Sequence, residues 1–185
     1  MTTTLDSPVV SAAPALRRLY FARFGFAIVW AALLFSTGKH LGGLATALLI
    51  LYPLFDVAAA VVDARSAGAA GPTRGLYVNM AISLLAALGL VVATGSGVPQ
   101  VLRVWGAWAI IAGVIQLIVA IKRRALGGQW PMILSGGLSV LAGGSFVMSA
   151  GAENPVLTSI AGYAVLGAIF FLVSAIRLGR AAKGN

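Results

Sequence analysis

The sequence predicts an all-α protein, a bundle of six transmembrane helices built as three parallel helical-hairpin repeats. Three observations support this fold class. Of the 185 residues, 60% are hydrophobic and only 9% are charged, whereas soluble domains carry about 25% charged residues. The apolar residues form six stretches of about 20 residues, and at 1.5 Å rise per residue each covers a hydrocarbon core of roughly 30 Å. Lysine and arginine gather at alternate ends of these stretches, as in multi-pass membrane proteins.

The first apolar stretch, residues 19–37, follows a short polar tail. Residues 1–16 are small, polar and interrupted by proline, so we expect a disordered cytoplasmic tail. The stretch itself has full spanning length and no A-x-A cleavage site directly after it, which predicts a retained anchor rather than a signal peptide. The remainder, residues 17–185, is predicted to form a single membrane domain, because few residues lie outside the apolar stretches.

Five further apolar stretches complete the bundle, at residues 43–62, 76–94, 101–121, 130–150 and 156–176. Loops rich in glycine and proline separate the first stretch from the second, the third from the fourth and the fifth from the sixth. They lie at residues 38–42, 95–100 and 151–155. The predicted hairpins are therefore residues 19–62, 76–121 and 130–176, joined by longer basic loops at 63–75 and 122–129.

The basic residues predict the orientation of the chain. With the N-terminus inside, only Lys39 and Arg103 of the 13 lysines and arginines face outward, so the positive-inside rule gives N-in and C-in.

A net charge of +9 would suggest nucleic acid in a soluble chain. Here the charges sit at helix ends without an aromatic-basic stripe, so we expect no nucleic-acid partner. Anionic lipid head groups at the cytoplasmic face are the expected partners. The remaining eleven basic residues are Arg17, Arg18, Arg23, Arg65, Arg74, Lys122, Arg123, Arg124, Arg177, Arg180 and Lys183.

A repeat with a period near 56 residues is visible. Residues 108–112 match residues 163–167, 55 positions later, and residues 79–87 match residues 135–143, 56 positions later. The same step leads back from Asn79 to Arg23 and from Ala112 to Asp56, although the first hairpin fits least well. Each unit starts and ends on the same side, which predicts parallel repeats around a pseudo-threefold axis normal to the membrane.

Glycines recur at helix-packing spacing in the fourth and fifth stretches. Gly106 and Gly113 are seven residues apart, as are Gly136 and Gly143. Small residues at such spacing let helix backbones approach closely in lipid. We expect these glycines to seat helices within the bundle, with a homo-oligomer contact as the alternative.

Ionisable and amide side chains inside the apolar stretches are the candidate functional residues, since charge in hydrocarbon is costly. All fall in the predicted cytoplasmic half, and Asp56 and Asp63 share one helix face because they are seven residues apart. The repeat places Arg23, Asn79 and Ser135 at equivalent positions facing a common axis. The predicted intramembrane polar centre comprises Arg23, Asp56, Asp63, Asn79, Gln116 and Ser135.

Three interpretations of this polar centre compete. In the first it is structural: Arg23 pairs with Asp56, because the guanidinium fork matches a carboxylate, while Asn79 and Gln116 tie helices together by hydrogen bonds. In the second it lines a cytoplasm-facing cavity for a small anion, a lipid head group or a peptide. In the third Asp56 lies on a proton or ion path. The apolar outer half, for example residues 31–35 and 88–92, weighs against a channel.

Other chemistries are excluded by residues that the chain lacks. There is no cysteine and one histidine, with four acidic residues that do not cluster, so we expect no metal and no cofactor. No nucleophile, base and orienting group occur together, so we do not expect an enzyme. Most of the aromatic residues near the ends of the stretches are expected to be membrane-interface anchors, with aromatic walls of a binding site as the alternative. These residues are Tyr20, Trp105, Trp108, Trp130 and Tyr163.

Part of the chain resembles a known family. The segments RVWGAWAIIAGVIQLIVAIKRR at 103–124, GGQWP at 127–131 and SGGLSVLAGG at 135–144 are similar to the HdeD family of bacterial acid-resistance membrane proteins. The likeness extends over residues 100–177 and is weaker over the first hairpin, where Tyr52-Pro53-x-x-Asp56 and residues 62–65 look like a subgroup signature. The resemblance implies an inner-membrane protein linked to acid or envelope stress. It implies no catalytic residues.

Two functional hypotheses follow. The leading one is a non-enzymatic plasma-membrane protein of the HdeD type that acts through contacts with lipid or with a membrane-protein partner. The alternative is a transporter or binder of a small solute, an anion or a proton, with a cytoplasm-facing polar site around Arg23 and Asp56.

Overall fold

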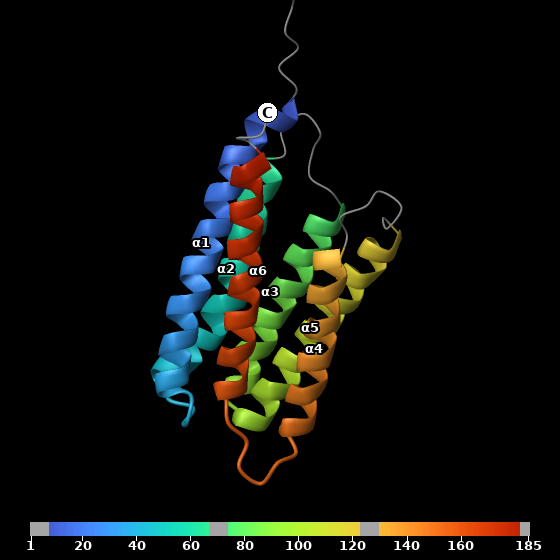
Figure 1. The fold of residues 1–185 in the computed structure, drawn as a ribbon. Coiled ribbons are helices and arrows are strands. Elements are labelled where there is room, and N and C mark those ends of the chain that lie inside the picture. Colours follow the sequence, from blue (N-terminus) through green and yellow to red (C-terminus); the bar gives the residue numbers. More distant parts are fainter. Residues whose placement is uncertain (1–7, 67–73, 123–129, 182–185) are drawn as a thin grey trace, which may run out of the picture.

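The computed structural model describes residues 8–66, 74–122 and 130–181. Within these ranges the chain is entirely helical apart from short loops (Figure 1). Every predicted apolar stretch lies within a helix or extends past its end by a residue or two. The helices are α1 (Pro8–Thr37), α2 (Gly43–Ser66), α3 (Arg74–Thr94), α4 (Val98–Lys122), α5 (Trp130–Ser149) and α6 (Thr158–Ala181).

The start of α1 corrects the expected tail. The helix begins at Pro8, so residues 8–16 are helical, and residues 1–7 lie outside the described part. Proline is favoured in the first turn of a helix, where its missing N–H would have no partner, and the alanines that follow are strong helix formers.

Five of the six helices are long and apolar enough to cross a membrane: α1, α2, α3, α4 and α6. Helix α5 (Trp130–Ser149) has 20 residues, with an apolar run over Ile133–Ser149. At 1.5 Å per residue the helix is about 30 Å long, close to the thickness of a hydrocarbon core. A multi-pass membrane protein is therefore supported.

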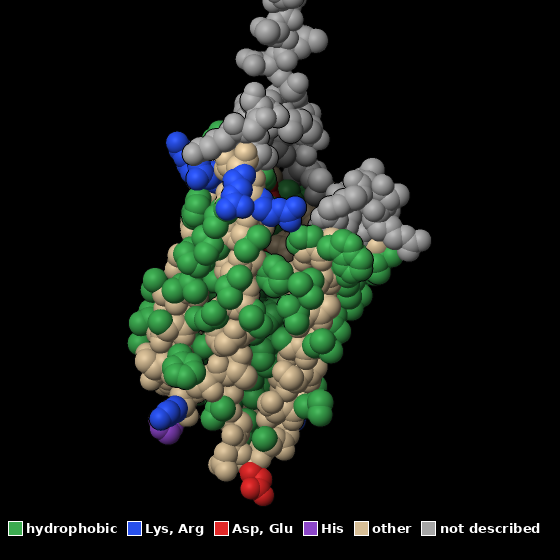
Figure 2. All heavy atoms as spheres, in the orientation of Figure 1, with side chains coloured by type: hydrophobic (Ala, Val, Ile, Leu, Met, Phe, Trp, Pro, Cys, Tyr) green, Lys and Arg blue, Asp and Glu red, His purple; other side chains and the backbone are tan. Residues whose placement is uncertain are grey.

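The two ends of the bundle differ in charge. Helix α1 begins, and α6 ends, at the same end of the bundle (Figure 1). Arginine side chains gather there, which we call the arginine-rich end (Figure 2). The opposite end, called the loop end, holds the three short loops and the charged residues Lys39 and Glu153. The described arginines at or near the ends of helices on the arginine-rich side are Arg17, Arg18, Arg65, Arg74, Arg177 and Arg180.

The helices form a ring in chain order, closed by contact between α6 and α1. The most extensive contacts join α4 to α5, α1 to α6 and α2 to α3. The helices of each predicted hairpin touch less, and α5 and α6 least of all. Packing between neighbouring hairpins, rather than within them, therefore holds the ring together.

Two pairs of glycines bring α4 and α5 into backbone contact. A Cβ atom on Gly106 would lie 2.6 Å from the carbonyl oxygen of Gly143, and one on Gly143 would lie 2.6 Å from that of Gly106. Gly113 and Gly136 face each other in the same way, at 2.6 and 2.9 Å. The expectation that these glycines seat helices within the bundle is confirmed for this pair of helices, because only glycine leaves room for the neighbouring backbone.

The half of the bundle nearer the loop end is a packed apolar core. Leu34, Leu90 and Leu49 are 0% exposed, and Phe146 is 2% exposed. Trp30 belongs to the same core, and its indole Nε1 donates a hydrogen bond of 2.6 Å to the carbonyl oxygen of Leu48. Open space is found instead in the half nearer the arginine-rich end.

Candidate functional site

A cavity of about 340 Å³ lies among the helices, and all six contribute to its lining. It reaches from aromatic side chains near the middle of the bundle to Asp63 and Leu76, close to the arginine-rich ends of α2 and α3. The structure brings all six sequence-predicted polar residues to this one cavity. They are Arg23 on α1, Asp56 and Asp63 on α2, Asn79 on α3, Gln116 on α4 and Ser135 on α5.

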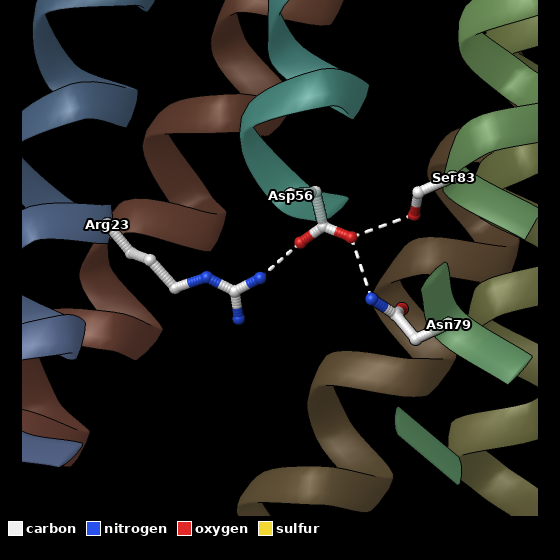
Figure 3. Close-up of polar contacts among 4 residues, drawn as sticks. All are labelled: Arg23, Asp56, Asn79 and Ser83. Carbon is white, nitrogen blue, oxygen red and sulfur yellow. Dashed lines mark hydrogen bonds and ion pairs between the residues drawn. The ribbon is translucent and has the colours of Figure 1, made fainter. Parts of the chain in front are cut away.

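Asp56 is the centre of a hydrogen-bond network on the α1–α3 side of the cavity (Figure 3). Arg23 Nη2 donates to Asp56 Oδ1 in an ion pair. The other carboxylate oxygen, Oδ2, accepts bonds of 2.8 Å from Asn79 Nδ2 and from Ser83 Oγ. Asn79 and Ser83 can reach the same oxygen because residues four apart share one face of a helix. One carboxylate thus links three helices.

The ion pair is largely shielded from solvent, so each charge depends on its partners within the protein. The Arg23 and Asp56 side chains are 15% and 20% exposed. A charge removed from water is tolerated only when it is paired and its remaining lone pairs are hydrogen-bonded. The guanidinium carbon of Arg23 also lies 4.8 Å from the ring centroid of Phe171, a cation–π contact that adds α6 to the network.

The opposite side of the cavity is lined by uncharged residues, some of them small. Ala112 on α4 and Gly167 on α6 lie where the 55- to 56-residue period would align them with Asp56. Ser139 Oγ on α5 lies 2.8 Å from Tyr163 Oη on α6, so these two hydroxyls satisfy each other. The cavity is therefore asymmetric, with the charged network on the α1–α3 side and only uncharged side chains lining it from α4, α5 and α6.

Aromatic rings form the deep end of the cavity, which we call its floor: Tyr52, Trp105 and Trp108. The ring centroids of Trp105 and Trp108 are 5.0 Å apart, and Tyr52 lies 5.5 and 6.2 Å from them. Trp105 is 0% exposed. The Nε1 atoms of both tryptophans are buried and have no hydrogen-bond partner among the described residues.

These positions overturn part of the predicted aromatic belt. Trp105 and Trp108 are not membrane-interface anchors, because both point into the bundle rather than toward lipid. Tyr163 is likewise a lining residue bonded to Ser139. Trp130 is 78% exposed, which suits an anchor. Proximity to a helix end is not enough to identify an anchor, since a helix in a ring also presents a face to the interior.

Three predicted residues line the cavity without joining the network. Between described residues, neither Gln116 nor Ser135 forms a side-chain hydrogen bond, so the predicted helix tie through Gln116 is absent, whereas Asn79 does tie α3 to α2. Asp63 has no salt bridge to any described residue, Arg23–Asp56 being the pair found. Within the described ranges, histidine and acidic side chains form no cluster that could hold a metal.

Ser83, Ser139 and Tyr52 were missed by sequence reasoning, and Trp105 and Trp108 were considered as part of a binding wall only as the alternative to anchors. A signal for the serines was present, because Ser83 is four residues from Asn79 and the repeat aligns Ser83 with Ser139. No comparable signal distinguishes Trp105 or Trp108 from an anchor.

Comparison of the chain with protein-family models, with curated proteins and with solved structures gives no match. The resemblance to the HdeD family thus depends on the segments between residues 103 and 144 and stays a prediction. Any statement of function has to come from the geometry of the cavity, because a helical bundle alone does not define an activity.

Proposed function

We propose that this chain is a non-catalytic, multi-pass plasma-membrane protein that binds a small molecule in its cavity, reached from the cytoplasm. The observation that carries the proposal is the cavity of about 340 Å³ with a charged network on one side and aromatic rings at its floor. Small-molecule sites are typically 300–1,000 Å³, largely apolar, with a few placed polar groups. Ionisable residues within membrane spans usually mark such sites.

The packed half of the bundle favours a binder or carrier over a channel. Beyond the floor, Leu34, Leu90 and Phe146 are buried with at most 2% exposure. A proton or ion path through Asp56 would need polar groups there. The anion interpretation is also weakened, since Arg23 is already neutralised by Asp56.

The three-repeat architecture of the HdeD type is part of the proposal. Leu34, Leu90 and Phe146 are spaced 56 residues apart and are all buried. The alternation of strong and weak helix contacts around the ring also has threefold character. Both observations support parallel repeats, in which each hairpin begins and ends at the same face.

The orientation is proposed from charge. Six described arginines at one end, against Lys39 and Arg103 near the other, support a cytoplasmic arginine-rich end by the positive-inside rule. Anionic head groups are the proposed lipid partners there. A link to acid or envelope stress is implied by the family resemblance only and stays a prediction.

Filling the cavity tests the proposal. A Cβ atom on Gly167 meets nothing within 4 Å, so Gly167→Leu is expected to fold and to project into the cavity. Gly162 on the same helix is exposed and equally uncrowded, so Gly162→Leu is the matched control. We expect wild type and Gly162→Leu to bind at least one small aromatic probe saturably and Gly167→Leu to bind none.

The measurement uses ¹⁵N-labelled tryptophan in the purified protein and follows the indole N–H resonances by NMR. The probes are durene, duroquinone, tetramethylbenzoate and benzyltrimethylammonium, which share a benzene-sized ring. A saturable shift of the Trp105 or Trp108 resonance reports occupation of the cavity. Binding is refuted if no probe shifts them saturably, or if a folded Gly167→Leu responds like wild type.

A further inference from the structure

We infer that the cavity floor selects an uncharged, planar molecule with a hydrogen-bond acceptor, a carbonyl compound of which a quinone is the simplest example. The recognising groups are the indole N–H donors of Trp105 and Trp108. This inference rests on the proposed binding function and adds the class of ligand.

The two indole donors supply the first argument. The Nε1 atoms of Trp105 and Trp108 are buried without a partner among the described residues, whereas Trp30 in the same aromatic cluster donates to a backbone carbonyl. An indole can only donate, and a buried donor left without an acceptor destabilises the protein. A ligand that places an oxygen at the floor would remove this penalty, so the floor favours an acceptor.

The distribution of charge supplies the second argument. The charged side chains that line the cavity are Arg23, Asp56 and Asp63. Asp56 is fully engaged, since Oδ1 accepts from Arg23 and Oδ2 from two further donors. The floor lies about one helical turn beyond Asp56, because Tyr52 precedes it by four residues on α2.

An ionic ligand at that depth would lack a partner of opposite charge. A cation would find no free carboxylate there, and an anion would lie near the carboxylate of Asp56 with Arg23 already paired. An unpaired charge taken into a low-dielectric interior is strongly disfavoured. An uncharged ligand avoids this penalty.

The shape of the floor supplies the third argument. Tyr52, Trp105 and Trp108 pack with ring centroids 5.0 to 6.2 Å apart, and aromatic faces favour flat rings by stacking. A planar ring satisfies these faces, and a carbonyl oxygen on its edge satisfies the indole donors. A hydrocarbon ring can stack on these aromatic faces but offers no acceptor to the indole donors.

Duroquinone and durene form a matched pair of probes, because they share the tetramethyl ring and differ in the two carbonyl groups. The chain has no cysteine, so no thiol is present that could add to the quinone. We expect duroquinone to move the indole proton resonances of Trp105 and Trp108 downfield, as hydrogen bonding does. Trp30, already bonded to Leu48, is an internal control within the same spectrum, and its resonance is expected to stay in place.

Removing the donors one at a time tests their role. Trp105→Phe and Trp108→Phe keep a ring and lose the N–H, so each is expected to weaken duroquinone binding about three- to tenfold, the effect of one neutral hydrogen bond. Durene binding is expected to change less than twofold. Trp130→Phe, at an exposed position, is the control for the substitution itself.

The outcomes separate the inference from the function on which it rests. Saturable binding with equal affinity for durene and duroquinone, or tighter binding of tetramethylbenzoate or benzyltrimethylammonium, would overturn the ligand class and leave the binding function standing. Absence of saturable binding by all four probes would overturn both. If neither phenylalanine variant folds, the duroquinone-specific downfield shift in wild type decides the question.

Discussion

Replacing Asp56 with asparagine is expected to lower the free energy of unfolding by about 3 kcal/mol. Breaking a buried ion pair by removing one partner costs about 3–5 kcal/mol in soluble proteins. Exposure of 15% and 20% for Arg23 and Asp56 places this pair at the lower end of that range. The arginine cannot discharge by losing its proton, so its charge stays without a partner.

The double variant Arg23→Gln/Asp56→Asn distinguishes the effect of leaving one charge unpaired from the separate effects of the two substitutions. Because it leaves no charge unpaired, we expect it to lose at least 1 kcal/mol less than the sum of the two single variants, as coupled neighbours do. Lys39→Gln at the loop end is the control and is expected to change stability by less than about 0.5 kcal/mol. The free energy of unfolding in mixed detergent micelles is measured for these four variants and for wild type. Single variants as stable as wild type would remove the structural role of the pair.

Substituting alanine for Gly143 is expected to destabilise the protein by about 3 kcal/mol, whereas the same change at the next residue is expected to be neutral or slightly stabilising. A Cβ on Gly143 would lie 2.6 Å from the backbone oxygen of Gly106 and 2.9 Å from the backbone nitrogen of Ile110. Backbone cannot move aside as a side-chain end can, so α4 and α5 must separate, an overpacking cost at or above the usual 1–3 kcal/mol. At Gly144 a Cβ meets nothing within 4 Å, and alanine is the better helix former by up to about 1 kcal/mol.

Two neighbouring glycines on α5, Gly136 and Gly137, allow the same comparison at the second contact between α4 and α5. Gly136 faces Gly113, and Gly137 beside it is uncrowded, so Gly136→Ala is expected to destabilise and Gly137→Ala is not. The measurement is the same unfolding titration. Equal effects within each neighbouring pair would show that α4 and α5 do not meet through these glycines.

Much of the fold could be predicted because hydrophobic length and glycine spacing act locally along the chain. Residues 43–62 and 76–94 fall inside α2 and α3, and the glycines spaced seven residues apart seat helices as expected, although the spacing did not say which helices meet. The polar residues were found for a similar reason: an arginine and an aspartate within apolar stretches have few alternatives to pairing with each other.

The sequence offered a cavity only as one of three interpretations, because the presence of a cavity depends on which side chains are missing from the interior. Ala112 and Gly167, at the repeat positions equivalent to Asp56, are small and leave space. Alanine and glycine are common throughout this sequence, so neither one signals a site. The direction in which a tryptophan points depends on how its helix is rotated in the ring. That rotation is set by packing between α4 and its neighbours, so the position of Trp105 near the start of α4 was misleading.

We propose a cavity that lies inside a membrane-spanning bundle and opens only at the arginine-rich, cytoplasmic end. A single cysteine can test it directly, because the chain has none of its own. Ser135→Cys lies in the cavity lining, with Arg180→Cys and Glu153→Cys as references for the arginine-rich and loop ends. We expect a membrane-impermeant maleimide to label Ser135→Cys and Arg180→Cys in inside-out vesicles only, and Glu153→Cys in right-side-out vesicles only. Labelling of Ser135→Cys from the same side as Glu153→Cys would contradict the claim.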